Sequence, residues 1–383
     1  MKNKLLFGIV LTFCSVLSIF GQNQQIASVV HAQYKINSAN LGEERTILVR
    51  VPAAYAGRDE KFPVVYMLDA HAPQNAMMSG IVEQQAWGGM MPEMIIVGIQ
   101  NTNRTRDLTP TKLADRAGSG GGDKFLDFLE KEVIPLVEKN YRTQPFRVFV
   151  GHSLGGLTAV YAALERPDLF NAYIAASPVL HWDNDFVIRR AEELFKQNRD
   201  WKKTMFIGLG NEPDYTKGFN AFQALLKRTK PKNFEYEFQE YPKENHGSVV
   251  LPVYYAGLRK VFEGWTPPVA GSFADLENHY RRLSERFGYE IKVPEALMNQ
   301  IGYQHLRANR LDEALSAFRK NVENYPNSAN VYDSLAEALE KTGQLKQAAE
   351  NYEKAFKRAE ANGEAQLAQS ARTNFERLSA KLK

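Results

Sequence analysis

Cysteine is almost absent from this sequence: the 383 residues contain one, Cys14, and it lies in the apolar segment that begins the chain. If processing removes that segment, the protein that remains can form no disulfide bond and has no thiolate to serve as a nucleophile. Its fold must then be held together by the apolar core alone.

The sequence also lacks an excess of charge of either sign. It has 48 basic and 44 acidic residues, and two of the basic ones, Lys2 and Lys4, belong to the N-terminal segment. This balance gives no indication of a nucleic acid or an anionic membrane as partner. With 44% hydrophobic and 24% charged residues, the composition excludes a disordered, collagen-like or multi-span membrane protein. The length predicts two to three domains of about 150 residues.

The apolar run Leu5–Phe20 follows two lysines and precedes a polar stretch that begins at Gln22. This pattern is typical of a secretory signal peptide, residues 1–21, with cleavage near Gly21. A membrane anchor is the alternative, but about 16 apolar residues are fewer than the roughly 20 that a spanning helix needs. We therefore expect a secreted or periplasmic protein that is free of the membrane after cleavage.

From residue 24 to 265, short β-branched or aromatic runs alternate with amphipathic segments. The predicted strands are Val29–Ile36, Arg45–Val51, Pro63–Leu68, Met94–Ile99, Arg147–Val150, Ala172–Ala176, Thr204–Leu209 and Phe234–Tyr241. Several later runs are apolar without alternation, which is typical of parallel strands buried on both faces. The first two have no helical pattern between them, so we expect an antiparallel start.

The segments between the later strands have helical periodicity. The predicted helices are Asp123–Asn140, Gly156–Arg166, Asn184–Asn198, Gly218–Lys230 and Ser248–Glu263. Strands that alternate with helices predict an α/β domain, here a mostly parallel eight-stranded sheet flanked by helices over residues 24–265.

After Thr266-Pro267-Pro268 the strand signals nearly vanish. We assign residues 266–293 to a linker whose helix, Phe273–Phe287, docks on the first domain. In residues 294–383 a period of 34 appears, since one set of small and large apolar positions recurs: Met298, Ile301, Gly302, Ala314 and Phe318 return as Tyr332, Leu335, Ala336, Ala348 and Tyr352. This resembles two tetratricopeptide repeats with a capping helix, Glu364–Leu382; an ordinary helical bundle is the alternative.

The octet Phe149–Gly156 contains Gly-x-Ser-x-Gly between an apolar strand and a helical pattern. Such a turn lifts a serine hydroxyl above the edge of the sheet, and glycines two residues to either side let strand and helix approach closely. The free amides of the helix N-terminus lie beneath the hydroxyl. The pattern predicts Ser153 as a nucleophile.

A serine nucleophile needs a base within hydrogen-bond reach, and the base needs a carboxylate to orient it. In this arrangement the acid and then the histidine follow the serine in the chain. His246 lies in the loop between the last strand and the last helix of the domain, where the base is needed, whereas His279 and His305 fall in helices. We predict His246 as the base.

Two carboxylates compete for the acid role, because Glu212 and Asp214 both follow the strand Thr204–Leu209. Glu212 is nearer the strand end and precedes a proline that stiffens the turn, so it is preferred to Asp214. Either could instead be a solvated loop charge or a helix N-cap.

The oxyanion formed on attack needs two preorganised donors. One should be the backbone N–H of Leu154, and the other should come from the loop Asp69-Ala70-His71, with Ala70 as the candidate. The sequence has no His-Gly-Gly-Gly run at this point.

These features together resemble an esterase family of the α/β-hydrolase superfamily, which includes enterochelin-type siderophore esterases, S-formylglutathione hydrolases and feruloyl or acetyl-xylan esterases. The motifs that carry the resemblance are Tyr66–Ala70, Gly98–Pro110, Gly151–Gly156, Ser177-Pro178 and Asn245-His246-Gly247. The resemblance implies the α/β-hydrolase fold, hydrolysis of a carboxylic ester, and a triad of Ser153, His246 and Glu212. The chain departs from the family at Ala70, where glycine is usual.

The loop after the strand Met94–Ile99 should border the site. Arg104 or Arg106 could hold an anionic or phenolic acyl group; alternatively, Arg106 pairs with the neighbouring Asp107 and fixes the loop. The prediction for substrate binding also includes His71, His152, His181 and Trp182. The side chain of His152 is expected to point away from that of Ser153.

No zinc-ligand spacing appears, and Gly118–Gly122 lacks the ending of a phosphate-binding loop, so we expect neither a metal nor another cofactor. The leading interpretation is a secreted serine esterase that acts on a small-molecule or saccharide ester, with the repeats as a candidate site for a protein partner. The alternatives are an inactive hydrolase-fold scaffold whose repeats bind a partner, or an acyltransferase or peptidase on the same fold.

Overall fold

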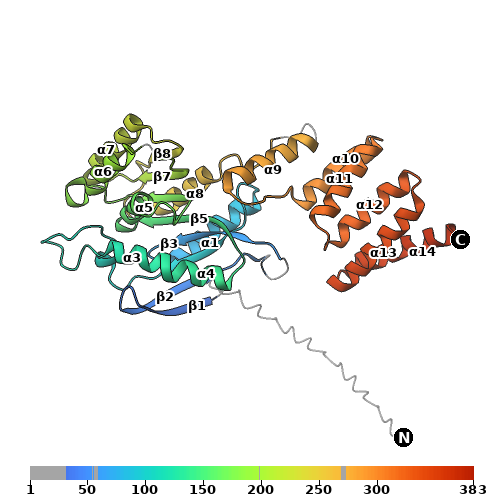
Figure 1. Cartoon of the computed structure of the whole chain (residues 1–383), viewed down its shortest axis with the longest axis horizontal. Coiled ribbons are helices and arrows are strands. Elements are labelled where there is room, and N and C mark those ends of the chain that lie inside the picture. Colours follow the sequence, from blue (N-terminus) through green and yellow to red (C-terminus); the bar gives the residue numbers. More distant parts are fainter. Residues whose placement is uncertain (1–31, 54, 56–58, 198, 269–272) are drawn as a thin grey trace, which may run out of the picture.

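The computed structural model describes residues 32–53, 55, 59–197, 199–268 and 273–383. The predicted signal peptide, residues 1–21, lies outside the described residues. Figure 1 shows the sheet-containing part at the left, the C-terminal helices at the right, and one helix, α9, between them.

Within the described residues the N-terminal part is built on one eight-stranded sheet of order β1-β2-β4-β3-β5-β6-β7-β8. The strands are β1 (Ala32–Ser38), β2 (Glu43–Arg50), β3 (Phe62–Met67), β4 (Ile95–Ile99), β5 (Thr143–His152), β6 (Ala172–Ala176), β7 (Lys203–Leu209) and β8 (Phe234–Glu240). β2 is antiparallel to β1 and β4, and the other neighbours are parallel. The mostly parallel sheet and its antiparallel start are confirmed.

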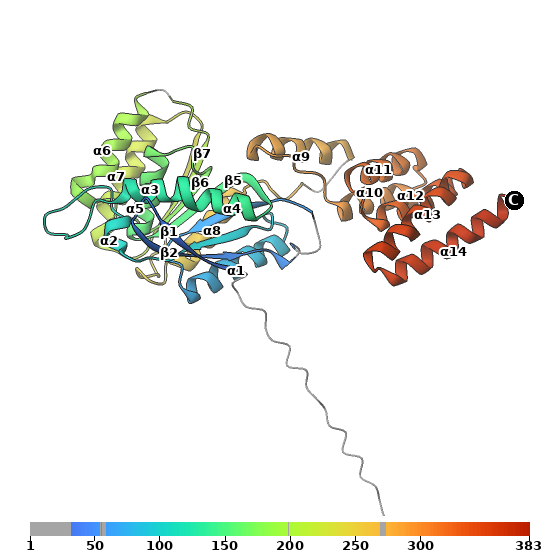
Figure 2. The same cartoon turned by 60° about the horizontal axis from the view of Figure 1, so that its bottom comes forward.

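Helices cover both faces of the sheet (Figures 1 and 2). One face packs against α3 (Gly122–Phe128), α4 (Ile134–Asn140), α5 (Leu154–Glu165), α6 (Trp182–Phe195) and α7 (Pro213–Thr229). The other packs against α1 (Ala72–Trp87) and α8 (Val250–Val261). Along β3, Val64 and Tyr66 belong to the first core and Val65 and Met67 to the second. Because both faces are buried, the strand sequence shows no alternation.

The helix α1 was not predicted from the sequence. Its buried positions include the polar residues Asn75, Ser79 and Gln85, which blur the apolar periodicity. Inside the fold all three side chains find partners: Asn75 Nδ2 donates to the carbonyl of His71 at 3.2 Å, Ser79 Oγ to that of Asn75 at 2.7 Å, and Gln85 Nε2 to that of Tyr255 at 3.2 Å. Two local bonds and one tertiary bond therefore hold the buried polar side chains of α1.

The helix α9 (Phe273–Phe287) joins the two parts of the molecule. The ring of Phe287 packs edge-on against Phe146 at 4.9 Å between centroids and stacks on Phe262 at 5.3 Å. His279 Nε2 lies 3.1 Å from the carbonyl oxygen of Trp265. The apolar core around α8 thus continues through α9 to the first C-terminal helix, where it includes Met298.

The C-terminal region is all-helical. Its helices are α10 (Glu295–Arg307), α11 (Leu311–Asn324), α12 (Ala329–Lys341), α13 (Leu345–Asn362) and α14 (Ala365–Lys381). At Gly302 the helices approach so closely that a Cβ atom would lie 2.4 Å from the ring of Phe318. The recurring positions are buried, as the 34-residue period requires, but assignment of these helices to the tetratricopeptide class stays a prediction.

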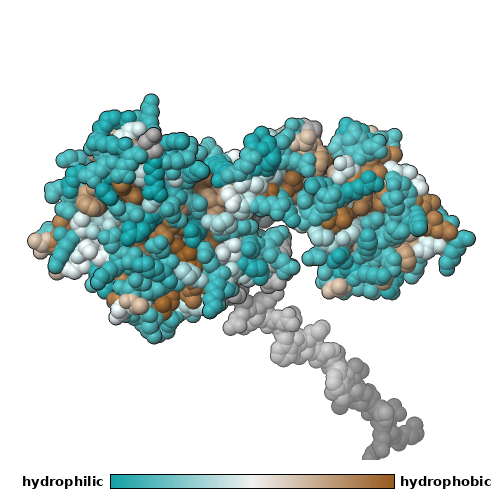
Figure 3. Space-filling model, in the orientation of Figure 1, coloured by the Kyte–Doolittle hydropathy of each residue, from teal (hydrophilic) through white to brown (hydrophobic). Residues whose placement is uncertain are grey.

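The surface seen in Figure 3 is largely hydrophilic over both parts, with smaller apolar areas between the C-terminal helices and in the middle of the N-terminal part. Among the described residues no helix combines the length and apolar character needed to cross a bilayer.

The position of Phe287 gives a test of the connection through α9. Replacing this buried ring in Phe287→Ala should lower the free energy of unfolding by about 3–5 kcal/mol, since it leaves a cavity among Phe146, Phe262 and Trp265. Urea denaturation of the full chain measures the change. Arg282→Ala, on the exposed side of the same helix, is the control and should be nearly neutral; equal effects of the two would show that α9 is not docked.

Candidate active site

Ser153 lies at the turn between β5 and α5 with a positive φ of 59°. A non-glycine residue in this region costs of order 1–3 kcal/mol, so the surrounding structure must impose the conformation. The Ser153 amide donates to the carbonyl of Ala176 at 2.9 Å, and the Ser153 carbonyl accepts from the amide of Leu157 at 3.0 Å. These bonds tie the turn to β6 on one side and to α5 on the other.

Gly151 permits this turn because strand and helix nearly touch there. A Cβ atom at Gly151 would lie 2.2 Å from the carbonyl oxygen of Gly155, and backbone cannot yield as a flexible side chain can. The Gly-x-Ser-x-Gly spacing is therefore a steric requirement of the turn that presents Ser153.

His246 and Glu212 form a pair at the carboxyl edge of the sheet. His246 Nδ1 hydrogen-bonds Glu212 Oε1. The other carboxylate oxygen, Oε2, accepts from the hydroxyl of Ser177 and from the amide of Gly210, the latter at 3.1 Å. Asp214 lies exposed in the first turn of α7. The structure thus brings Glu212, and not Asp214, to the histidine.

The ring of His246 packs against two other rings. Its centroid is 4.4 Å from that of His152 and 5.2 Å from that of Tyr215. Because His152 immediately precedes Ser153, this contact places His246 beside the serine turn. Within the described residues Ser153 Oγ has no hydrogen-bond partner; such bonds often tighten only when substrate is bound.

The ring of His152 packs against that of His246. That its side chain points away from that of Ser153 stays a prediction. Burial, and then the nearby charge of His246, lower the pKa of His152 to about 4. His152 is therefore a neutral ring at neutral pH, and its Nε2 atom is buried without a hydrogen-bond partner among the described residues.

The expected oxyanion donors differ in availability. Leu154 is the first residue of α5, where backbone amides lack an intrahelical acceptor. The amide of Ala70, in contrast, donates to the carbonyl of Ile99 at 3.1 Å, so the expectation that Ala70 supplies the second donor is wrong. The neighbouring amide of His71 donates to the carbonyl of Asp69 at 2.9 Å. That bond closes a three-residue turn, which substrate could open.

Arg104 is held at the rim of the serine turn by a bidentate ion pair. Its Nε donates to Asp69 Oδ1 at 2.7 Å, and its Nη2 donates to Asp69 Oδ2 and to the carbonyl of His152, each at 3.0 Å. The Arg104 side chain keeps about a third of its surface exposed, 34%. A fixed, partly exposed guanidinium thus stands next to the residue that precedes Ser153.

Arg106 pairs with carboxylates of its own loop and of β2, so the expectation that it binds substrate is wrong. All of its guanidinium nitrogens are bound: Nε to Asp107 at 2.7 Å, and Nη1 and Nη2 to Glu43 at 3.1 and 2.7 Å. The contact with Arg106 holds the pKa of Glu43 down at about 2. Asp107 also binds the buried Arg45 at 2.5 Å. This network joins the loop to β2. The alternative expectation, that Arg106 pairs with Asp107 and fixes the loop, is confirmed.

The remaining predicted residues are dispersed around the rim. Trp182 is buried, and its indole N–H donates to Thr111 Oγ1 at 3.0 Å, so its role is to attach the loop that carries Thr111. His181 is exposed and packs edge-on against Tyr215 at 5.2 Å. His71 is exposed at the start of α1.

Three residues of this arrangement were not singled out by the sequence analysis as site residues: Ser177 and Tyr215, which contact Glu212 and His246, and Asp69, which binds Arg104. Ser177 has a positive φ of 41° and is fully buried. Its position directly after β6 was the signal that could have revealed it. Tyr215 carries no such signal.

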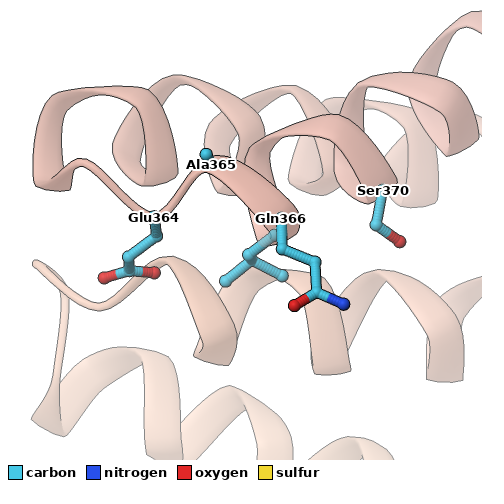
Figure 4. A pocket seen from close by; sticks show the side chains of 5 residues that line it. Glu364, Ala365, Gln366 and Ser370 are labelled. Carbon is cyan, nitrogen blue, oxygen red and sulfur yellow. The ribbon is translucent and has the colours of Figure 1, made fainter. Parts of the chain in front are cut away.

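Two cavities occur in the described part of the chain, and neither is bordered by Ser153. One, of about 340 Å³, is bordered by Gly210, Glu212 and Glu240 at the ends of β7 and β8. The other, of about 520 Å³, lies far from the serine turn at the start of α14 and is lined by Glu364, Ala365, Gln366, Leu367 and Ser370 (Figure 4). No cluster of three metal-ligating side chains occurs among the described residues.

Comparison with known proteins shows what class of protein carries this site. Residues 38–249 match the model of the family described as "Putative esterase". Ferri-bacillibactin esterase BesA of Bacillus subtilis is 30% identical over 223 residues, which cover 50% of this chain and 75% of that protein. Siderophore triacetylfusarinine C esterase of Aspergillus fumigatus is 29% identical, over 39% of this chain and 56% of the relative.

Solved structures agree with the fold. An IroE-like serine hydrolase from Shewanella oneidensis is 30% identical, has a TM-score of 0.67, and is matched over 75% of this chain and 98% of its own. An uncharacterised protein from Capnocytophaga ochracea is 18% identical with a TM-score of 0.63. The match covers 91% of this chain and 99% of that protein, and it supports the fold alone.

The chain belongs to this esterase family of the α/β-hydrolase superfamily. It is a carboxylic ester hydrolase of the serine hydrolase class, like the siderophore esterases that it resembles.

The buried pair of Arg45 and Asp107 gives a test of how the rim loop is held. Asp107→Asn removes the charge that compensates a fully buried guanidinium, so it should lower the free energy of unfolding by about 3 kcal/mol. Glu44→Gln, which breaks the exposed pair with Lys35, is the control and should change it by no more than about 1 kcal/mol. Urea denaturation compares the two; similar small losses would show that the buried pair does not stabilise the loop.

Proposed function

We propose that this protein is a secreted esterase that hydrolyses a siderophore-type carboxylic ester through a triad of Ser153, His246 and Glu212 and an acyl-enzyme intermediate. The observation that carries the proposal is the contact of Glu212 with His246 Nδ1, made next to the strained turn that presents Ser153. The pair leaves the other ring nitrogen of His246 free to act as a base.

In the proposed first step Ser153 Oγ attacks the ester carbonyl carbon and gives its proton to His246 Nε2. The tetrahedral intermediate then collapses, the alkoxide leaves with the proton from His246, and the acyl group stays on Ser153. Water, deprotonated by the same ring, attacks the acyl-enzyme and releases the carboxylic acid. Glu212 stabilises the imidazolium in each half-reaction and is itself held by Ser177 and Gly210.

The oxyanion is assigned to the amide of Leu154, supported by its place at the first position of α5. For the second donor we propose the amide of His71, because the amide of Ala70 is occupied by Ile99. An amide in a three-residue turn can exchange its local acceptor for a developing negative charge, which forms the stronger hydrogen bond.

Siderophore-type esters are supported as substrates by the relatives' activities and by Arg104. Ferric complexes of catecholates are anionic, and a guanidinium fixed by Asp69 could bind their oxygen atoms without a large entropic cost. The exposed rings of His71 and His181 complete the proposed rim. Feruloyl and acetylated-saccharide esters remain the comparison substrates.

The extracellular or periplasmic location is proposed from the N-terminal segment alone, and a partner for the C-terminal helices is proposed from the sequence alone.

Two other activities compete with the esterase. An inactive scaffold would keep the fold but lose turnover, and an acyltransferase or peptidase would give different products. Activity measurements therefore separate the esterase from the scaffold and from the acyltransferase or peptidase.

The nucleophile can be tested directly. Ser153→Ala should abolish hydrolysis of p-nitrophenyl acetate, by at least about 10³-fold, because the residual catalysis of a triad enzyme without its nucleophile is small. Labelling by a fluorophosphonate probe should also disappear while the circular dichroism spectrum is unchanged. Ser370→Ala, an exposed serine on α14, is the matched control. Full activity of the Ser153 variant would overturn the assignment.

The substrate class can be tested through Arg104. For Arg104→Gln we expect the ratio of kcat/KM for ferri-bacillibactin to that for p-nitrophenyl acetate to fall about tenfold, the loss of one charge-assisted contact of about 1.4 kcal/mol. Product analysis by liquid chromatography, with a feruloyl ester and an acetylated sugar in parallel, gives the ratios. An unchanged ratio would remove Arg104 from substrate recognition.

A further inference from the structure

We propose that His152 and Tyr215 are positioning residues whose ring contacts hold the imidazole of His246 in the orientation needed for proton transfer. The proposal rests on the proposed role of His246 as the base and extends it to two residues without such a role so far. His152, first interpreted as a substrate-binding residue, then acts through His246.

The two rings lie on different elements and contact His246 separately. His152 ends β5, and its ring is tilted by 45° to that of His246 with 4.4 Å between the centroids. Tyr215 lies in the first turn of α7, also at 45°, with 5.2 Å between the centroids. The ring of His181 packs edge-on against that of Tyr215 at 5.2 Å between centroids.

His246 needs such support because it lies on a loop and is only partly covered. Its side chain keeps 41% of its surface exposed. Asn245 stabilises the loop backbone by accepting from the amides of Gly247 and Ser248, at 2.9 and 3.0 Å, but these bonds do not reach the ring. The bond to Glu212 fixes the direction of Nδ1 and leaves the ring free to tilt about that axis. Contacts from the two neighbouring rings restrict the tilt.

The acid and one of the two rings are placed by the start of α7. Glu212 is the N-cap residue of this helix, and Tyr215 lies three residues later in its first turn. The amide of Tyr215 donates to the carbonyl of Glu212 at 3.0 Å, which starts the helix. A single backbone geometry thus sets both the hydrogen bond and the ring contact that His246 receives.

His152 can make this contact without placing a second positive charge beside His246. Glu212 faces His246, while Asp69 and Arg104, themselves paired, lie nearest to His152. Burial keeps His152 neutral at neutral pH, so protonation of His246 during the reaction meets no like charge from this neighbour. The Nε2 atom of His152 has no hydrogen-bond partner among the described residues, so this nitrogen contributes no competing bond when its ring packs on His246.

The experiment measures kcat and KM for p-nitrophenyl acetate with the full chain. Tyr215→Ala and His152→Ala should each lower kcat about tenfold and leave KM within twofold, because the ring contacts act on proton transfer. Tyr215→Phe should restore kcat to within about twofold, since it keeps the ring and loses only the hydroxyl. The control is Tyr236→Ala, which removes a half-buried tyrosine from the edge strand β8.

The double variant, Tyr215→Ala with His152→Ala, tests whether both rings act on one target. Its loss in kcat should differ from the product of the single losses, because the residues share His246. The proposal is overturned if Tyr215→Phe is as slow as Tyr215→Ala, if KM alone rises, or if the losses follow the unfolded fraction seen by circular dichroism. It fails separately from the proposed function: if His246→Ala retains turnover, the triad itself is wrong.

Discussion

The close approach of β5 and α5 at Gly151 is the constraint on which the rest of the site depends. Strand and helix backbones nearly touch there, and the chain turns so sharply that Ser153 takes a positive φ. That turn sets the free amide of Leu154 at the start of α5 and places His152 toward the loop of His246. The core must supply the strain energy, since the predicted mature chain has no cysteine to crosslink it.

Around this turn, charged side chains form ion pairs and hydrogen bonds that hold the loops in place. Asp69 holds Arg104, and the buried pair of Asp107 and Arg45 anchors the same loop to β2. On the other side Ser177 and Gly210 hold Glu212. The pairs of Asp69 with Arg104, of Arg45 with Asp107 and of Ser177 with Glu212 join elements far apart in the chain, so the rim is rigid although it consists of loops. Preorganisation of this kind is what lets fixed dipoles stabilise charge that develops during ester cleavage.

The sequence was sufficient for features that repeat locally or have strict spacing. Uninterrupted apolar runs predict buried parallel strands, and Gly-x-Ser-x-Gly after such a run predicts the turn at Ser153, because sterics allow few other residues there. It failed where partners come from elsewhere in the chain. The amide of Ala70 is taken by Ile99, the guanidinium of Arg106 by Glu43, and the side-chain amide of Gln85 in α1 by Tyr255 in α8.

By itself the sequence determined the α/β class, the order of the strands along the chain, the serine turn and the family, since these follow from local sterics and from motifs with strict spacing. The tertiary structure alone decided which carboxylate meets His246, which rings lie against it, and which arginine stays exposed at the rim. The physical reason is that these contacts are made by side chains on loops between different strands. Their distances are set by the packing of the whole sheet, on which the spacing of residues along the chain carries no information.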